Sequence, residues 1–107
     1  MAFVRVAEVG AIKNGEGISV EIEGKPIAVF HCDGRIYATD NTCPHRGGPL
    51  GEGLVDGTVV TCPWHGWEYD VTSGKCLTNP KARIRIYPVK VEGNDVLLDA
   101  DERRGGC

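Results

Sequence analysis

Two short segments of the chain each place a cysteine and a histidine close together. Cys43 and His45 stand in "CPHRGGPLGEG", and Cys62 and His65 stand in "CPWHGWEYD", with sixteen residues between the two pairs. A proline follows each cysteine and glycines come soon after, which is typical of tight loops rather than helices. Thiolates and imidazoles are ligands for soft or borderline metals, so these residue types in this spacing indicate a metal centre.

Two kinds of metal centre accept two thiolates and two imidazoles. A zinc ion would take all four side chains in one tetrahedron, but the commonest zinc spacing pairs Cys with Cys and His with His. Here each loop carries one of each, which favours a binuclear iron–sulfur cluster with the cysteines on one iron and the histidines on the other. Gly47, Gly48 and Gly66 would let backbone amides approach the sulfides. A structural zinc module remains the alternative.

The two loops must be positioned by strands, because short alternating apolar and polar runs surround them. No window shows a helical period, and turn residues separate the runs, so we expect an all-β fold of nine or ten antiparallel strands in a sandwich or barrel. Two Asp-Gly pairs, Asp33-Gly34 and Asp56-Gly57, predict hairpin turns. Residues 83–91, "RIRIYPVKV", read as the longest strand, with a bulge at Pro88 where the apolar parity shifts.

The length of 107 residues is that of one domain. Both Cys/His loops lie within residues 41–80. We therefore expect a base built from about 1–40 and 81–100, with a metal-binding subdomain inserted between these parts. Residues 101–107, "DERRGGC", have no apolar side chain to bury beyond one cysteine and are expected to be a frayed tail.

The composition of the chain limits which classes of partner the protein can bind and in which compartment we expect it. A net charge of −3 argues against a nucleic-acid partner, which would need a basic face. No run approaches the roughly 18 apolar residues of a membrane span. The N-terminal residues alternate from Phe3 onward as a strand does, without the charged and apolar blocks of a signal peptide. We expect a soluble cytoplasmic monomer with no membrane partner.

The five cysteines do not suggest a disulfide framework, because their number is odd and no secretory signal precedes them. Cys32 and Cys76 are expected to be small apolar residues of strands, although a bridge between them stays open. Cys107 is expected to be an unbridged thiol on the tail. His31, next to Cys32, is expected to be an ordinary strand histidine.

The segments "CPHRGGPLGEG" and "CPWHGWEYDVTSGK" resemble the two boxes of Rieske [2Fe–2S] proteins, and the resemblance is detailed over residues 43–75. It implies the Rieske β-fold and one [2Fe–2S] cluster per chain. It also implies that Cys43 and Cys62 ligate the buried iron and that His45 and His65 ligate the outer iron.

Departures from the family pattern bear on the reduction potential. High-potential members carry an extra cysteine in each box, where this chain has Gly48 and Trp64, and a serine where it has Trp67. Tyr69 matches the family tyrosine that donates to a ligand sulfur. Fewer hydrogen bonds to the sulfurs imply a low-potential Rieske centre. The residues expected around the four ligands are Arg46, Gly47, Gly48, Gly66, Trp67 and Tyr69.

The resemblance further implies a soluble Rieske-type ferredoxin, a one-electron carrier between a flavin-dependent reductase and the terminal oxygenase of a ring-hydroxylating dioxygenase system. It would not itself be an enzyme. The alternative within the family is the small Rieske subunit of a nitrite reductase or of another multicomponent oxidoreductase. An apolar rim round the outer histidines is the expected face for transient docking; its residues are Pro44, Pro49, Leu50, Pro63 and Trp64.

Overall fold

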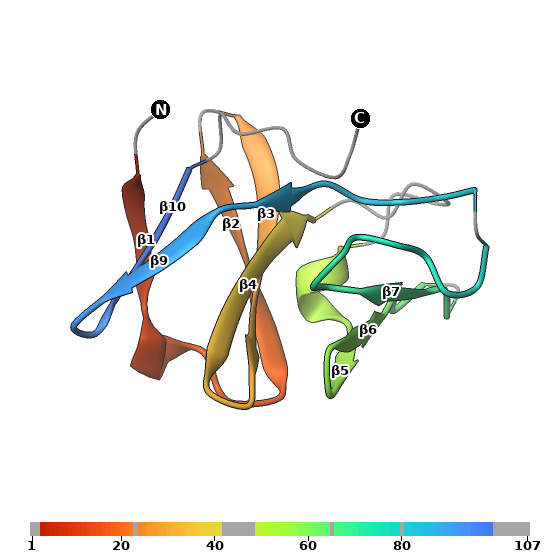
Figure 1. Cartoon of the computed structure of the whole chain (residues 1–107), viewed down its shortest axis with the longest axis horizontal. Coiled ribbons are helices and arrows are strands. Elements are labelled where there is room, and N and C mark those ends of the chain that lie inside the picture. The colour runs from red at the N-terminus through yellow and green to blue at the C-terminus, as the bar shows by residue number, and fades with distance from the viewer. Residues whose placement is uncertain (1–2, 23, 42–48, 65, 80, 100–107) are drawn as a thin grey trace.

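The residues that the structure describes form three antiparallel sheets (Figure 1). The computed structural model describes residues 3–22, 24–41, 49–64, 66–79 and 81–99. The first sheet has the order β1 (Val4–Glu8), β10 (Asp95–Leu98), β9 (Val89–Glu92), and the second has the order β2 (Glu16–Ile22), β3 (Lys25–Cys32), β4 (Arg35–Asp40), β8 (Ile86–Tyr87). The third has the order β5 (Leu54–Asp56), β6 (Val59–Thr61), β7 (Glu68–Asp70), and two 3₁₀ helices are η1 (Val9–Ala11) and η2 (Leu50–Glu52). The all-β prediction is confirmed.

Strand β3 is buried on both of its faces and separates two hydrophobic cores. Ile27 and Val29 point into one core, and Ala28 and Phe30 point into the other, all four without exposed surface. The base core lies between the first two sheets and comprises Ile12, Ile22, Ile27, Val29, Ala38, Tyr87, Val96 and Leu98. The loop-side core comprises Ala28, Phe30, Cys32, Leu50, Val60, Cys62, Tyr69, Val71, Cys76 and Ile84. The continuous apolar run of β3 therefore reflects burial from both sides.

The third sheet packs on the loop-side face of β3 (Figure 1). All three of its strands come from residues 54–70, within the segment expected to be inserted, whereas the other two sheets use the flanking parts of the chain. The division into a base and a metal-binding subdomain remains a prediction. Across the described ranges, no helix has the length and apolar character needed to cross a bilayer.

Both Asp-Gly hairpins form, but one is shifted by a residue. Asp33 and Gly34 make the two-residue turn between β3 and β4, with φ of 50° and 85°, as the sequence predicts. In the second hairpin Asp56 pairs with Val59, so the loop is residues 57–58 rather than Asp56-Gly57. Gly57 takes the positive φ of 63° that the first loop position needs, which fixes the register.

The prediction of one long strand over residues 83–91 is wrong, because the chain changes sheets at Pro88. Strand β8 pairs with β4, and β9 pairs with β10 in the first sheet. Proline has no N–H to give to a ladder, so pairing is interrupted there. Its carbonyl still accepts a hydrogen bond from the Asp99 N–H at 3.2 Å. The expected bulge is thus a passage from one sheet to another.

The cysteines and the histidine that were expected to be structural lie in ordinary environments. Cys32 and Cys76 are buried in the loop-side core and form no disulfide. The Cys76 sulfur accepts a hydrogen bond from the Asn79 N–H at 3.3 Å. His31 donates from Nδ1 to the Ile12 carbonyl at 2.8 Å. Cys107 lies outside the described residues.

Tyr87 makes the stability of the fold sensitive to alkaline pH. Its hydroxyl donates to Asp40 Oδ1 at 2.6 Å, and burial followed by this hydrogen bond raises the pKa of Tyr87 to about 12. The unfolded chain loses that proton near pH 10, so the stabilisation is complete below about pH 10 and is lost as the pH rises to about 12. We expect Tyr87→Phe to flatten the fall in free energy of unfolding over this interval, measured by urea titration at several pH values. Tyr37→Phe is the control, and an equally steep fall in Tyr87→Phe would contradict the assignment.

Candidate metal centre

The second Cys/His loop joins β6 to β7 as a closed turn. The Cys62 N–H donates to the Trp67 carbonyl at 2.7 Å, and the Gly66 N–H donates to the Cys62 carbonyl at 3.0 Å. Gly66 has φ of 76°, which only glycine adopts without strain. These bonds fix the first and last residues of the loop and leave Pro63 and Trp64 exposed at its tip.

Cys62 points inward from this loop. Its side chain is only 2% exposed and belongs to the loop-side core, which also holds the fully buried Tyr69. Trp64, two residues on, is 59% exposed. A buried thiol beside an exposed tip fits the sequence prediction of an inner iron held by cysteine. His65 lies outside the described residues, so the outer position stays a prediction.

Asn41 fixes both ends of the first Cys/His loop. Its carbonyl accepts the Leu50 N–H at 2.7 Å, and its Oδ1 accepts the Gly51 N–H at 2.7 Å. The same Oδ1 accepts the Ser19 hydroxyl at 3.1 Å, and the Asn41 N–H donates to the Pro26 carbonyl at 3.2 Å. Asn41 therefore holds the loop closed and ties it to β2 and β3. Sequence reasoning missed this residue, although an asparagine between a strand and a glycine-rich loop is a known signal for such bonding.

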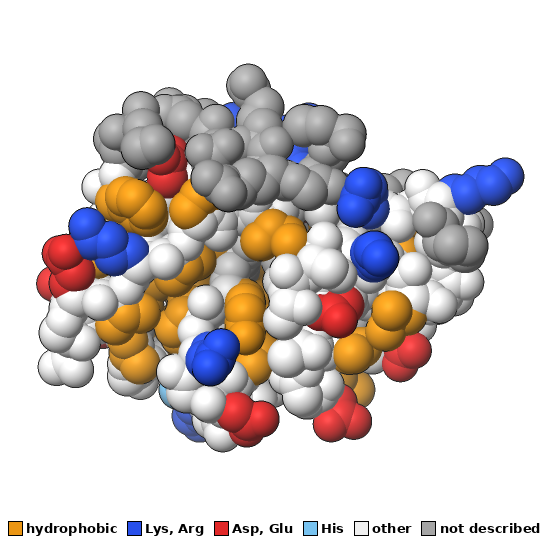
Figure 2. All heavy atoms as spheres, in the orientation of Figure 1, with side chains coloured by type: hydrophobic (Ala, Val, Ile, Leu, Met, Phe, Trp, Pro, Cys, Tyr) orange, Lys and Arg blue, Asp and Glu red, His pale blue; other side chains and the backbone are white. Residues whose placement is uncertain are grey.

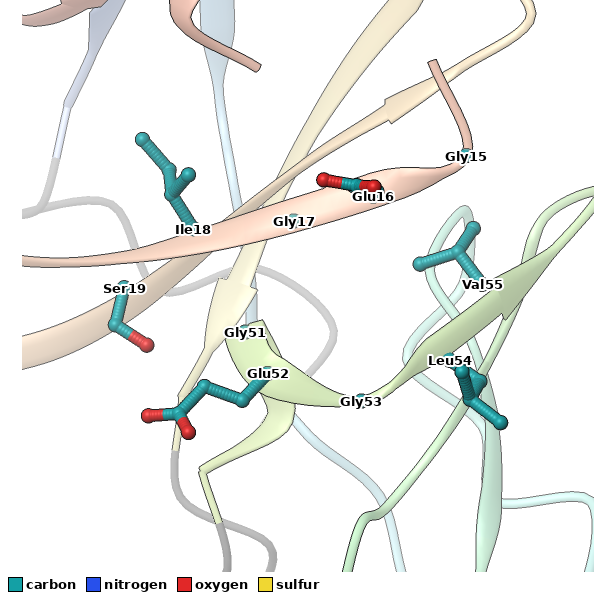
Figure 3. A pocket seen from close by; sticks show the side chains of 10 residues that line it. All are labelled: Gly15, Glu16, Gly17, Ile18, Ser19, Gly51, Glu52, Gly53, Leu54 and Val55. Atoms are coloured by element: carbon teal, nitrogen blue, oxygen red, sulfur yellow. The ribbon is translucent and has the colours of Figure 1, made fainter. Parts of the chain in front are cut away.

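Two glycines after the first loop make close contacts with other segments. In Figure 3, Gly51 and Gly53 lie on the segment that passes beside the strand of residues 17–19 and continues into Leu54. A Cβ on Gly51 would lie 2.6 Å from Ser19 Oγ, and a Cβ on Gly53 would overlap the Thr61 carbonyl oxygen. Thr61 directly precedes Cys62. The absence of side chains thus lets the chain after the first loop approach β2 at Gly51 and the residue before Cys62 at Gly53.

A groove of about 580 Å³ opens beside this contact, between β2 and β5 (Figure 3). The carboxylates of Glu16 and Glu52 and the exposed side chain of Leu54 lie along it. Within the described ranges, no three His, Cys, Asp or Glu side chains are grouped as metal ligands. The groove therefore offers no alternative to the predicted ligand set, of which Cys62 alone is described.

The remaining predicted site residues divide into described and undescribed ones. Trp67 and Pro49 are half-buried, and Tyr69 has no exposed surface. The predicted residues outside the described ranges are Cys43, Pro44, His45, Arg46, Gly47, Gly48 and His65. A buried thiol, a glycine loop closed by backbone bonds and a second loop held beside it fit a cluster with thiolate and imidazole ligands.

Leu50 does not belong to the docking rim, and that prediction is corrected. Its side chain has no exposed surface and packs in the loop-side core. The bond from its N–H to the Asn41 carbonyl fixes it as the first residue of η2, which faces the interior. Leu50 is therefore a residue of the loop-side core with no exposed surface for a partner to touch.

We expect Asn41→Ala to loosen the first loop. The substitution leaves the Gly51 N–H without its acceptor, which costs about 1–3 kcal/mol in free energy of unfolding for a buried group. The holo-protein should also lose its visible absorption faster on mild heating, because the loop ends separate. Asn14→Ala, which removes a single bond from the Asp33 N–H, is the matched control. Equal behaviour of the two variants would show that Asn41 has no special role.

Comparison with known proteins agrees with this arrangement. The Rieske [2Fe–2S] domain model matches residues 2–88. The ferredoxin component of the naphthalene 1,2-dioxygenase system of Pseudomonas aeruginosa is 39% identical over 89 residues, covering 82% of this chain and 86% of the relative. The chain belongs to the Rieske [2Fe–2S] family and carries a [2Fe–2S] cluster of Rieske type.

Solved structures of similar proteins share the fold of this chain over most of its length. The Sphingomonas yanoikuyae B1 ferredoxin is 35% identical with a TM-score of 0.84, covering 92% of this chain and 98% of that chain. A chain in the complex of reduced oxygenase and oxidized ferredoxin in carbazole 1,9a-dioxygenase is 29% identical with a TM-score of 0.86, covering 95% of each chain. A structure described as a putative nitrite reductase small subunit is 24% identical and shares the fold alone.

Proposed function

We propose that this protein is the ferredoxin component of a multicomponent dioxygenase system, a one-electron carrier rather than an enzyme. The observation that carries the proposal is the agreement in length and sequence with relatives that are themselves named ferredoxin components of such systems. A reductase, flavin-dependent by the family resemblance, would supply the electron, and a terminal oxygenase would accept it. The complex of an oxygenase with a similar ferredoxin supports the second half of this route.

The proposed ligands are Cys43 and Cys62 for the inner iron and His45 and His65 for the outer iron. When bound, the cluster supplies reversible one-electron chemistry at a potential raised by its neutral imidazole ligands. The chain's part is to hold the cluster and shield its inner side. The burial of Cys62 against Tyr69 supports that role, because it keeps water from the inner thiolate.

We further propose that the carrier is a cytoplasmic monomer that meets each partner transiently. The buried, unbridged thiols of Cys32 and Cys76 support a reducing compartment. A carrier that must leave one partner to reach the next needs a small contact rather than a permanent one.

The test of the proposed function is chemical analysis followed by a shuttle assay. Anaerobically purified protein should contain about two irons and two acid-labile sulfides per chain and should give a rhombic paramagnetic signal on reduction. It should then restore electron flow between a dioxygenase reductase and its oxygenase when their own ferredoxin is omitted. A colourless zinc protein would overturn the proposal. A red protein that transfers no electron to either partner would contradict the role of carrier and favour the alternative, a fixed subunit of a multicomponent oxidoreductase.

Trp64 is expected to contribute to docking. We expect Trp64→Ala to lower kcat/KM for reduction of the carrier by about tenfold, since exposed tryptophans dominate small interfaces. Stopped-flow reduction at several carrier concentrations measures this, and an unchanged visible spectrum shows that the cluster is intact. Val91→Ala, an exposed apolar change on β9, is the control. A rate like that of the control would remove Trp64 from the docking face.

A further inference from the structure

Charge is strongly separated along the chain after the second Cys/His loop. Residues 71–91 carry five of the twelve Lys and Arg residues and none of the fifteen Asp and Glu residues. Residues 50–70 carry four acidic residues and no Lys or Arg. Figure 2 shows blue side chains over the segment that joins β7 to β8, and red side chains below it, near β5 and β6. In this view both kinds of charge lie at the same end of the molecule, with the basic side chains above the acidic ones.

Three of the positive charges of this segment, on Lys75, Lys81 and Arg83, have no ion-pair partner among the described residues. Lys75 and Arg83 stand directly opposite each other in an isolated antiparallel bridge, an arrangement that is unfavourable for like charges. Among the described residues, the ion pairs involve Arg5 and Lys90, and none involves Lys75, Lys81 or Arg83. Lys90 is paired with Glu92 at 3.2 Å. The repulsion between Lys75 and Arg83 would be relieved by an anionic group placed over them.

An apolar side chain lies among these charges. Leu77 is 55% exposed and, with Lys75, Lys81 and Arg83, borders an open depression of about 600 Å³. These four residues are named the basic face below. An exposed leucine next to charged side chains is typical of protein interfaces, which have an apolar centre and a polar rim.

The basic face is attached to the strand that carries the second Cys/His loop. The Leu77 N–H donates to the Glu68 carbonyl at 2.7 Å, and Tyr69 is bridged to Cys76. Glu68 is the first residue of β7, immediately after the loop that begins at Cys62. A protein bound at the basic face would therefore lie against the segment that is hydrogen-bonded to β7, the strand that follows the second Cys/His loop.

We propose that the basic face is a docking surface for a redox partner protein that presents carboxylates. The inference rests on the proposed function and adds the chemistry of the partner. Charge complementarity identifies the occupant, since three unpaired cations and an exposed leucine match an acidic face with an apolar centre. The chain's net charge of −3 disfavours nucleic acid. Trp64 is not among the residues that border the depression of the basic face.

The kinetic test compares two double variants with the same change in net charge. K81E/R83E reverses the basic face, and K13E/R35E reverses two exposed cations at the β2 and β4 ends of the base. Holo-protein is assayed for reduction by the reductase, and for oxidation by the oxygenase, purified from the source cells by these activities. At low salt, K81E/R83E should raise the KM for the carrier about fivefold to tenfold with one of the two partners, and the difference from wild type should vanish at high salt. K13E/R35E should stay within about twofold of wild type.

A second readout does not depend on electron transfer. Carbodiimide activates a carboxylate, and a lysine amine in contact with it then forms the amide bond while the carbodiimide leaves as a urea that carries the carboxylate oxygen. Cross-linking of the wild-type carrier with the same purified partner should give, by mass spectrometry, links from Lys75 or Lys81 to partner Asp or Glu residues, and none from Lys13. Links made only through carboxylates of this chain to partner lysines, or equal KM values for both double variants, would overturn the proposal.

Other results of the kinetic and cross-linking experiments would also test the proposal. Links from Lys75 or Lys81 to the acidic residues of a second copy of this chain, with a dimer in sedimentation, would show that the surface is a self-contact and would overturn the proposal. Failure of the wild-type carrier to take or give an electron with either partner would instead contradict the proposed function. If wild-type electron transfer is normal and K81E/R83E has the same KM as K13E/R35E, the docking inference is contradicted while the proposed function stands.

Discussion

Cys62→Ser is expected to yield a colourless protein that still folds. A serine hydroxyl stays protonated near neutral pH and is a hard ligand, so it cannot replace a thiolate on iron. Loss of partners outside the ligand set already lowers metal affinity 10- to 100-fold, so loss of a ligand should leave at least about tenfold less iron and sulfide per chain. Metal analysis and visible absorption measure the loss, and circular dichroism should retain the strand signal, because the base core does not include Cys62.

The matched control for this prediction is Cys76→Ala. Cys76 is as deeply buried as Cys62 and lies in the same core, but it follows β7 rather than a Cys/His loop. We expect the control to lower stability by about 1 kcal/mol through the small cavity, while the cluster content stays normal. The ligand assignment fails if Cys76→Ala loses the cluster and Cys62→Ser keeps it.

Gly53→Ala is expected to disturb the contact between the two loops. Gly53 has φ of −78° and ψ of 173°, which alanine adopts freely, so backbone strain is not the cause. The added methyl group would overlap the Thr61 carbonyl oxygen, and neither partner of that clash is a flexible side chain. We expect a loss of about 1–3 kcal/mol in free energy of unfolding, together with a lower cluster content, because Thr61 directly precedes Cys62.

Gly10→Ala provides the comparison for Gly53→Ala. No atom lies within 4 Å of a Cβ on Gly10, and this glycine does not have a positive φ. The substitution should change stability by less than about 0.5 kcal/mol. Urea unfolding and iron content, measured side by side, separate a steric effect from a general intolerance of glycine replacement. Equal results for the two variants would refute the proposed close contact.

Local patterns in the sequence were sufficient for many of the strands and turns. The alternating apolar and polar residues at 18–22 fall in β2, and the Asp33-Gly34 pair predicted the hairpin of β3 and β4, because both signals act between residues that are neighbours in the chain. The apolar run of β3 is buried on both faces. The metal centre was also visible in this way, since the residues of each box lie within a few positions of one another.

Contacts between distant segments were not predictable in the same way. Leu50 was assigned to the apolar rim expected round the outer histidines, but its burial depends on Asn41 and on the face of β3 across the core. The change of sheets at Pro88 depends on which strands are available to pair on either side, and a single apolar run does not contain that information. The sequence also did not reveal that Asn41 holds both ends of its loop.

By itself, the amino-acid sequence determined the all-β class, most of the turns, and the residue types and spacing that indicate a Rieske cluster. Only the tertiary structure decided which side chains face the interior and which charges meet at the surface. Cys62 and Trp64 are two residues apart, yet one is buried and the other exposed. Lys75 and Arg83 are eight positions apart and directly opposed. The physical reason is that hydrogen bonding and packing between segments set these positions, and their energies depend on residues far away in the chain.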